Sequence, residues 1–391
     1  MLRQHVIDGL VHVIRDRKHV EPAARCKAAG VLQEIARARS PGLQRELERS
    51  ASRCLVQMLK RGTEMEMEVA ECALLEIAGS PRGAYYVHRA GLVPSICALF
   101  QAGATQYHHR RGCRLMCALA KCHEALDSLM QPALIEALGT CLKVGSPKTQ
   151  QLACSTLVVL LRQCSASMAA RARRLVLPLV CLVRESACPL EMRRDAASCL
   201  ERLTKERGMR ELVLASGAIG AVVRLLGDAS DLRTCAWGVM LARNLSYRHV
   251  GVCSAFVRAG IMQQMVEMLD TPLGPQVVAA LCCLNSSGKF SHEIVAAGAV
   301  PLLVDLLAAS EQPGHSSGQA LPCTPHCEQC MRLNHNAWRT KCLTAKLLSE
   351  LMAPWNVVSA GTAEVAAGAI PPLVAMLAEG RHVDASPTFV D

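Results

Sequence analysis

The stretch AGAVPLLVDLL, residues 297–307, combines a glycine, a proline and an apolar run in a pattern that predicts a turn followed by a short helix. Glycine accepts the positive φ of a sharp turn between helices, and proline suits the first helical turn, where an N–H has no partner. Four other stretches are similar: AGLVPSICALF (90–100), SGAIGAVVRLL (216–226), AGIMQQMVEML (259–269) and AGAIPPLVAML (367–377). The chain therefore contains an internal repeat.

The spacing of the glycines defines the period of this repeat. Gly91, Gly217, Gly260, Gly298 and Gly368 are separated by 126, 43, 38 and 70 residues. Because 126 is three times 42, two degenerate copies are expected near residues 133 and 175. Copies that fit are ALIEALGTCL from 133 and LVLPLVCLV from 175, and weaker ones are RCLVQML (53–59) and HVIDGLVHVI (5–14).

A longer amphipathic helix is predicted after each copy, and a short helix before each glycine. Examples of the longer helix are MEVAECALLEIA (67–78), KTQQLACSTLVVLL (148–161) and EMRRDAASCLERLT (191–204). RGMRELVLAS (207–216) is an example of the short one. A unit of this size cannot bury its own apolar face, so stacked neighbours must supply the core.

This three-helix unit, its period near 42 residues and the phrase AGAIPPLV resemble armadillo repeats. The resemblance covers nearly the whole chain, is strongest in 207–309 and 356–378, and is degenerate before 207. It implies an all-α fold, a right-handed α-solenoid of about eight to nine three-helix armadillo-like repeats. HEAT repeats are the alternative, which the glycine turn disfavours because it marks three helices rather than two.

We expect four regions along the chain. Armadillo-like repeats occupy 1–309, and the last, incomplete repeats occupy 336–380 before a tail at 381–391. Between them, 310–335 is rich in Gly, Pro, Ser and Cys, a composition that favours a loop insertion.

The expected loop also contains a weak candidate for a zinc site. Cys323, Cys327, Cys330 and His335 have the short spacings that a tetrahedral site needs. Only Cys327 and Cys330 form a CxxC pair, and no second pair follows at the usual distance. A loop that happens to hold several thiols is the favoured interpretation, and we expect no metal or other cofactor.

The formal net charge of +10 is unevenly distributed along the 391 residues. Residues 1–210 carry 32 Lys and Arg against 19 Asp and Glu, net +13, whereas residues 211–391 carry 11 against 14, net −3. A basic half attracts nucleic acid, anionic lipid or an acidic protein, unless it is an ordinary solvated face. The densest basic clusters are HHRRGCR (108–114) and RARR (171–174). Aromatic residues make up only 3% of the chain, so base stacking and nucleic-acid binding are not expected.

Other functional classes find little support in the sequence. No glycine-rich phosphate loop, HExxH or nucleophile elbow occurs, so we predict no catalytic residue and no enzyme. No apolar run reaches the length of a transmembrane segment, and no signal peptide is evident. Most of the 21 cysteines fall in apolar helical patterns, as reduced core thiols do. We therefore expect a protein of the cytoplasm, the nucleus or both.

The stretch CAWGVMLARNLS (235–246) resembles the third helix of armadillo repeats. In that family, third helices line a concave groove, and their asparagines bind the backbone of an extended peptide. The resemblance makes Asn244 a candidate for this role, because an amide offers both a donor and an acceptor. Trp237 lies one turn before the usual tryptophan position, so it suits the core as well as the groove. Asn285, or Ser286 beside it, is the next candidate.

Steps of about 42 residues give the equivalent position in each third helix. This column reads Glu34, Glu76, Lys121, Arg162, Arg202, Asn244, Asn285 and Glu350. Nuclear-import adaptors need several asparagine–tryptophan pairs, which this column lacks. It is more similar to grooves of the β-catenin kind, in which basic residues receive acidic extended partners.

We therefore predict a non-catalytic scaffold or adaptor for protein–protein interaction. An acidic or phosphorylated linear segment of a protein partner would lie in the concave third-helix groove. The predicted groove residues are Lys121, Arg162, Arg202, Trp237, Asn244 and Asn285. The alternatives are cargo binding like that of the nuclear-import adaptors, an RNA-binding helical solenoid, and a solvated surface without a ligand.

Overall fold

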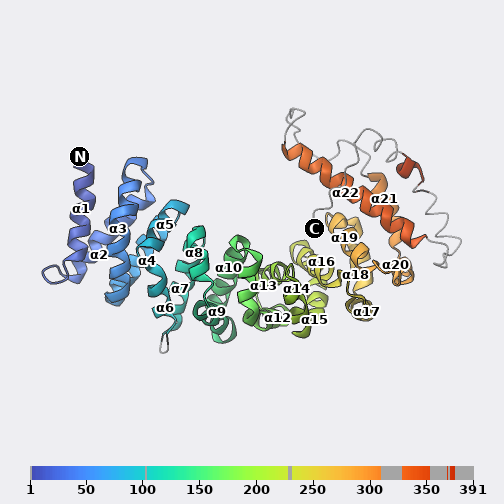
Figure 1. Ribbon diagram of the computed structural model, residues 1–391, viewed down its shortest axis with the longest axis horizontal. Coiled ribbons are helices and arrows are strands. Elements are labelled where there is room, and N and C mark those ends of the chain that lie inside the picture. The colour runs from blue at the N-terminus through green and yellow to red at the C-terminus, as the bar shows by residue number, and fades with distance from the viewer. Residues whose placement is uncertain are drawn as a thin grey trace. The chain divides into compact units, whose positions relative to one another are not determined.

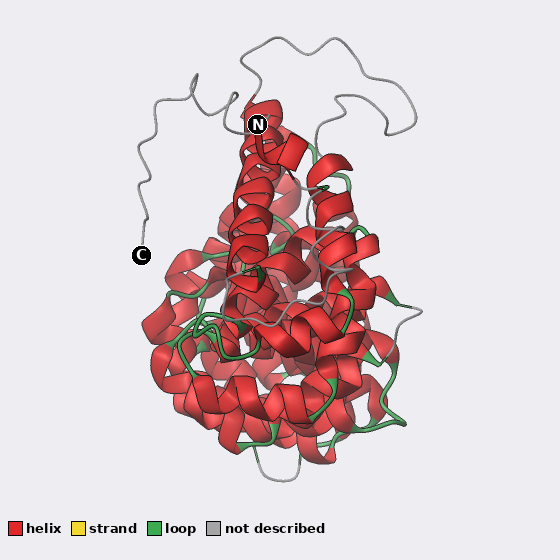
Figure 2. Cartoon of the chain, turned by 90° about the vertical axis from the view of Figure 1, so that its right-hand side faces the viewer, coloured by secondary structure: helices red, strands yellow, loops and turns green. Residues whose placement is uncertain are grey.

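The computed structural model describes residues 2–101, 104–227, 231–309, 328–352, 368 and 370–374. In these ranges every regular element is a helix, and no strand occurs (Figure 1 and Figure 2). The all-α solenoid predicted from the repeats is thus confirmed. The chain divides into two compact units, unit 1 (Met1–Ser216) and unit 2 (Gly217–Asp391).

Unit 1 contains five repeats and the first helix of a sixth. Its elements are α1 (Leu2–Arg15), α2 (Pro22–Arg37), α3 (Pro41–Arg61), α4 (Glu64–Ile77), α5 (Pro81–Arg89), α6 (Leu92–Leu99), α7 (Gln106–Leu119), α8 (His123–Leu129), α9 (Pro132–Val144), α10 (Pro147–Gln163), α11 (Ala166–Ala169), the 3₁₀ helix η1 (Ala170–Leu175), α12 (Val176–Arg184), α13 (Leu190–Leu203) and α14 (Arg207–Ala215). The third helices α2, α4, α7, α10 and α13 pack on one another in series.

Unit 2 continues the same pattern. Its elements are α15 (Ala218–Leu226), α16 (Leu232–Ser246), α17 (Val250–Arg258), α18 (Ile261–Glu267), the 3₁₀ helix η2 (Met268–Asp270), α19 (Gly274–Leu284), α20 (Ser291–Ala296), α21 (Ala299–Ala309) and α22 (Glu328–Leu351). Its third helices α16, α19 and α22 also pack in series.

The core consists mainly of small and aliphatic side chains between neighbouring helices. Leu157 and Leu160 of α10, for example, are fully buried, and so are Leu74 and Ile77 of α4. Burial of one such side chain stabilises the fold by about 1.5–3 kcal/mol. Ala and Leu also lose little conformational entropy in a helix, whereas the β-branched Val loses more. Ala and Leu therefore favour both the formation of the helices and their stacking.

The glycine turns between first and second helices have the predicted conformation. Gly91, Gly217, Gly260 and Gly298 have φ of 86°, 90°, 76° and 83°, and each directly precedes the second helix of its repeat. A Cβ built on Gly91, Gly260 or Gly298 would meet no atom within 4 Å. The left-handed backbone, rather than crowding, therefore requires glycine there.

The degenerate repeats form their second helices where the spacing predicts them, but by other turns. Before α9, Gln131 is extended (φ −67°, ψ 150°) and Pro132 begins the helix. Before α12, η1 continues directly into the helix. In the second repeat, α3 runs unbroken for 21 residues, because no glycine or proline follows Gly42 before its end.

The expected loop at 310–335 ends earlier than its composition indicates. Helix α22 begins at Glu328, and no proline or glycine occurs between Pro325 and Pro354 to oppose a helix. Residues 310–327, 353–367, 369 and 375–391 lie outside the described residues, and so does the whole of the expected tail at 381–391. Residues 370–374 are helical, within the last predicted copy of the repeat.

Replacement of Gly91 by alanine is expected to destabilise unit 1 by about 1–2 kcal/mol, because alanine must adopt the left-handed conformation. The control is Gly30→Ala inside α2, where a Cβ also meets nothing within 4 Å but the backbone is helical. That change should stabilise by about 0.5–1 kcal/mol. Urea unfolding midpoints measure both effects, and shifts of equal sign would contradict the assignment.

Candidate functional site

The exposed sides of the third helices α2, α4, α7, α10 and α13 form what we call the third-helix face of unit 1. A hollow of about 590 Å³ opens on this face. Its lining residues are Glu71, Tyr107, Arg110, Arg111, Arg114, Pro147, Lys148, Gln151, Leu152 and Pro189. We refer to it as the α7–α10 pocket, since most of these residues come from the amino-terminal halves of these two helices.

Local sequence signals place the two helix starts that form the pocket. Thr105 caps α7 by accepting a hydrogen bond from the backbone N–H of His108, whose side chain reaches back to the Thr105 backbone. Pro147 begins α10 at a position where a missing N–H is harmless. Along α7, Tyr107, Arg110 and Arg114 then recur at the three- and four-residue spacing that places side chains on one helical face.

Arg111 lies at the base of the pocket and is only 1% exposed. Its Nε donates to Glu71 Oε2 at 3.0 Å, and its Nη2 donates to Glu64 Oε1 at 3.2 Å. Arg114 Nη1 contacts the other Glu71 oxygen at 2.8 Å. Burial by itself would lower the pKa of Arg111, but the contacts with Glu71, Tyr107 and Glu64 outweigh it and the pKa is raised. This cation is therefore permanently charged.

Two donors in the pocket lack an acceptor. Arg111 Nη1 and Arg110 Nε are buried and have no hydrogen-bond partner among the described residues. The guanidinium groups of Arg111 and Arg110 lie 4.5 and 5.8 Å from the Tyr107 ring centroid, where the ring face attracts cations.

The balance of charge in the pocket is positive. Four cations, Arg110, Arg111, Arg114 and Lys148, line it together with one carboxylate, Glu71. Its remaining walls include apolar surface from Pro147, Leu152 and Pro189. Chemically, the pocket suits an anionic group next to an apolar side chain.

Polar contacts one repeat apart connect the third helices. Arg25 Nε donates to Glu66 Oε1 at 2.7 Å between α2 and α4, and both side chains are buried. Ser155 Oγ donates to Asp195 Oδ2 at 2.6 Å between α10 and α13. The Glu71–Arg111 pair makes the same connection between α4 and α7. Of these contacts, the Glu71–Arg111 pair fixes a cation of the α7–α10 pocket.

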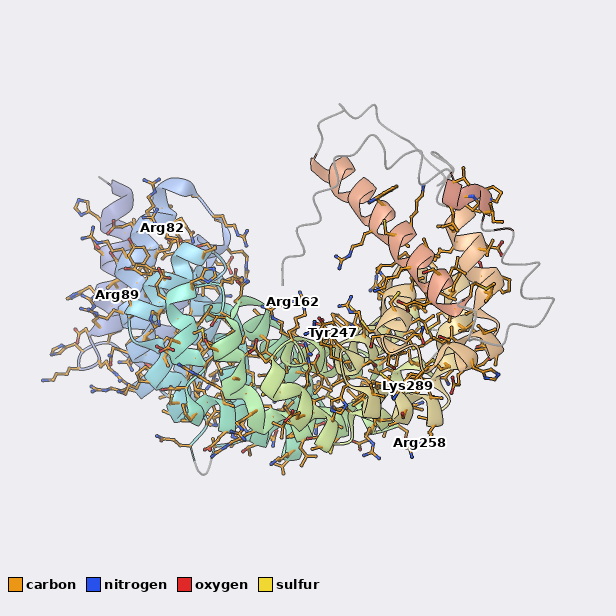
Figure 3. The ribbon with its side chains drawn as sticks, turned by 45° about the vertical axis from the view of Figure 1, so that its right-hand side comes forward. Arg82, Arg89, Arg162, Tyr247, Arg258 and Lys289 are labelled. Atoms are coloured by element: carbon orange, nitrogen blue, oxygen red, sulfur yellow. The ribbon has the colours of Figure 1, made fainter. Side chains whose placement is uncertain are left out.

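Among the predicted groove residues, Lys121, Arg162 and Arg202 occur at the carboxyl ends of α7, α10 and α13. Lys121 Nζ donates to the Gly79 carbonyl at 3.1 Å, and Arg202 Nε donates to the Leu161 carbonyl at 3.0 Å. Each therefore also binds the end of the preceding third helix, where carbonyl groups lack helical partners. Arg162 is exposed (Figure 3).

The other three predicted groove residues belong to unit 2. Trp237 is half-buried in α16, and Asn244, near the end of this helix, is 9% exposed. Asn285, which follows α19, is 1% exposed. Its Nδ2 donates to Glu350 Oε2 at 3.3 Å, and its Oδ1 accepts from Ser291 Oγ at 3.1 Å. The Asn285 amide thus binds within unit 2, because the neighbouring third helix α22 presents a carboxylate to it.

The weak zinc candidate cannot be assembled from the described side chains. Cys323 and Cys327 lie outside the described residues, and only the backbone of Cys330 and His335, in α22, is described. Elsewhere in the described ranges, no group of three or more His, Cys, Asp or Glu side chains is arranged to hold a metal ion.

The sequence does not predict the α7–α10 pocket. It indicates only a basic cluster at HHRRGCR (108–114), which contains three of the four cations of the pocket. The informative signal is that Tyr107, Lys148 and Pro189 are spaced by 41 residues, one repeat apart. Side chains at equivalent positions of stacked helices meet, so this spacing brings the cluster beside the next third helix.

Comparisons with known proteins bear on the fold. No family model matches the chain, and no curated protein matches it. Among solved structures, one similar structure is an engineered protein that was a target of the Northeast Structural Genomics Consortium. Its TM-score is 0.71 and its sequence identity is 18%, and the match covers 96% of this chain and 92% of the engineered protein. A designed armadillo repeat protein in complex with the peptide (KR)4 has a TM-score of 0.55 and 17% identity, and covers 60% of this chain and 100% of its own.

The chain has an armadillo-like fold. A second designed armadillo repeat protein agrees, with a TM-score of 0.54, 15% identity, and coverage of 61% of this chain and 99% of its own. None of the armadillo-like helices that the structure describes has the length and apolar character needed to cross a membrane.

The buried Arg25–Glu66 pair predicts a specific loss of stability in acid. Burial by itself would raise the pKa of Glu66, but the Thr63 N–H and the Arg25 guanidinium outweigh it and hold the pKa below its ordinary value. The pair therefore stabilises unit 1 above the unfolded-state pKa of about 4.3, and this stabilisation is lost as the pH falls through the lower folded-state value.

The variant Glu66→Gln should lose about 3–5 kcal/mol at neutral pH, because it leaves Arg25 buried and unpaired. Below the folded-state pKa its deficit should shrink. Urea unfolding from neutral pH to about pH 3 measures this trend. The exposed Glu68→Gln on the same helix is the control, and an equal pH dependence of both variants would refute the assignment.

Proposed function

We propose that this chain is a non-catalytic protein-binding scaffold or adaptor that holds an acidic or phosphorylated linear segment on the third-helix face of unit 1. The α7–α10 pocket is the observation that carries this proposal. It contains four cations, one carboxylate and two buried N–H groups without an acceptor. A buried donor left unsatisfied costs about 1–3 kcal/mol, so an incoming oxygen acceptor would recover binding free energy there.

The pocket also indicates how such a segment would be held. A carboxylate or phosphate would lie against Arg110 and Lys148, which form no ion pair within the described residues. An adjacent apolar side chain would cover Leu152. Guanidinium groups suit this role because their planar fork donates two hydrogen bonds to one anion.

The cations at the carboxyl ends of the third helices would extend this site. Lys148, Gln151, Ser155 and Arg162 follow one face of α10 from its start to its end. Packed helices are separated by about 8–10 Å, and an extended peptide advances about 3.3 Å per residue, so one repeat corresponds to about three peptide residues. Arg162 can contribute its charge freely, whereas Lys121 and Arg202 would share theirs with carbonyl groups.

The charge of the face supports an acidic rather than a basic partner. The designed armadillo repeat protein of the comparison was solved with the basic peptide (KR)4. Here the pocket is cationic, so the complementary peptide is acidic. We further propose that the protein acts in the cytoplasm or nucleus, where thiols stay reduced. Burial raises the pKa of Cys54 to about 11 and of Cys282 to about 12, so neither thiol is ionised at neutral pH.

The proposal is tested with two labelled peptides, EEFEEEFEE and KKFKKKFKK, by fluorescence anisotropy in physiological salt. The acidic peptide should bind, and Arg110→Glu with Lys148→Glu should weaken it by roughly 2–4 kcal/mol, because attraction becomes repulsion in a partly buried site. Arg162→Glu should cost roughly 1 kcal/mol. Thermal stability should hardly change, since neither Arg110 nor Lys148 forms an ion pair with a described carboxylate.

The control is the double variant Lys143→Glu with Arg184→Glu, which makes the same charge change at exposed positions of α9 and α12 outside the pocket. The control should retain the affinity of the unmodified chain. Stronger binding of the basic peptide, or equal losses in the pocket and control variants, would rule out the proposed site.

A further inference from the structure

A second positive surface of unit 1 lies where α1, α3 and α5 meet. Two hollows of about 330 and 390 Å³ adjoin there and share Arg15 and Arg53. The smaller is also lined by Arg49 and Arg89, and the larger by Arg17 and Arg61. We call these six residues the arginine trough. They come from first and second helices or from the ends of these helices, so they are distinct from the α7–α10 pocket.

Little negative charge offsets the arginine trough. All six arginines are exposed, and the carboxylates that line the two hollows are Asp8 and Glu66. Glu66 is already paired with the buried Arg25. Among the residues that the structure describes, none forms an ion pair with Arg15, Arg49, Arg53 or Arg89. Like charges held together destabilise the empty unit, and a bound anion would relieve this repulsion.

The six arginines line the two hollows from neighbouring parts of unit 1. Arg49 and Arg53 are one turn apart on α3, Arg15 ends α1, and Arg89 projects from the end of α5 (Figure 3). The side chain of Arg17 donates a hydrogen bond to the Arg61 carbonyl, which ties the segment after α1 to the end of α3. The smaller hollow thus receives cations from three helices, and a hydrogen bond joins two of the residues that line the larger.

We propose that the arginine trough binds a compact ligand that carries several phosphate groups, of the chemical class of the inositol polyphosphates. Every cation of the trough is arginine, whose fork matches two phosphate oxygens at once. Two small adjoining hollows that share Arg15 and Arg53 fit phosphates clustered on one small ring.

Two other polyanions fit the trough less well. An extended acidic peptide spreads its carboxylates along a line at about 3.3 Å per residue, whereas the two hollows are compact. Single-stranded nucleic acid binds through stacked bases as well as phosphates, and Tyr86 is the sole aromatic side chain among the residues lining either hollow.

The experiment uses the full chain and inositol hexakisphosphate, with calorimetry for affinity and thermal unfolding for stability. The ligand should bind and raise the unfolding temperature, because it binds the folded state alone. Arg49→Ala with Arg53→Ala should weaken binding by about tenfold or more and lower the salt dependence of the affinity. Arg49→Lys with Arg53→Lys keeps the charge but loses the fork, so an intermediate loss is expected.

The matched control is Arg173→Ala with Arg184→Ala, which removes two exposed arginines of unit 1 that line neither hollow. Its affinity should stay within about twofold of the unmodified chain. If the alanine variant of the trough fails to fold, as circular dichroism would show, the lysine variant supplies the test.

The source of the phosphates is resolved with vesicles of phosphatidylcholine that contain about 5% phosphatidylinositol 4,5-bisphosphate. If the chain binds the vesicles and inositol hexakisphosphate displaces it from them, the ligand of the trough is a lipid headgroup. If the chain binds inositol hexakisphosphate but not the vesicles, the ligand is a soluble compound. Three outcomes would overturn the proposal. They are no binding of inositol hexakisphosphate, an equal loss of affinity in the control variant, and displacement of bound inositol hexakisphosphate by single-stranded RNA of lower total charge.

Discussion

The packing of each third helix against the third helix of the next repeat is the contact on which the rest of the structure depends. No single repeat is large enough to bury its own apolar face, so α7, for example, packs against α4 and α10 of the neighbouring repeats as well as against α5 and α6 of its own. The same contact brings residues 40 or 41 positions apart within hydrogen-bonding distance, as in Arg25–Glu66 and Glu71–Arg111. It also creates the α7–α10 pocket, whose two sides belong to different repeats.

The sequence predicts the fold well because the decisive signals are local. A glycine turn followed by an apolar run suffices to place α6, α15, α18 and α21, and the period locates α9 and α12 without any glycine turn. The repeat pattern does not predict that α3 runs unbroken or that α22 begins as early as Glu328, since a helix continues wherever no proline or glycine interrupts it.

The candidate site is less predictable, because side-chain partners come from the adjoining repeat. Position along the period places Lys121, Arg162 and Arg202 at equivalent helix ends, but it does not reveal that two of them bind carbonyl groups. Asn285 has the residue type of a peptide-binding amide, yet Glu350 and Ser291 occupy its amide. The positive half of the chain likewise contains two different surfaces: in the pocket Glu71 neutralises part of the charge, whereas in the arginine trough little does so.

The buried pair Arg25–Glu66 has a consequence for how the helices choose their alignment. Ridges of side chains on α2 lie in grooves of α4, so the next alternative alignment of the two helices is a shift of one turn. Such a slip of about 5.4 Å would leave two buried charges unpaired, an arrangement far less favourable than the native one. We infer that this ion pair selects a single axial register, as a lone buried asparagine does in a coiled coil.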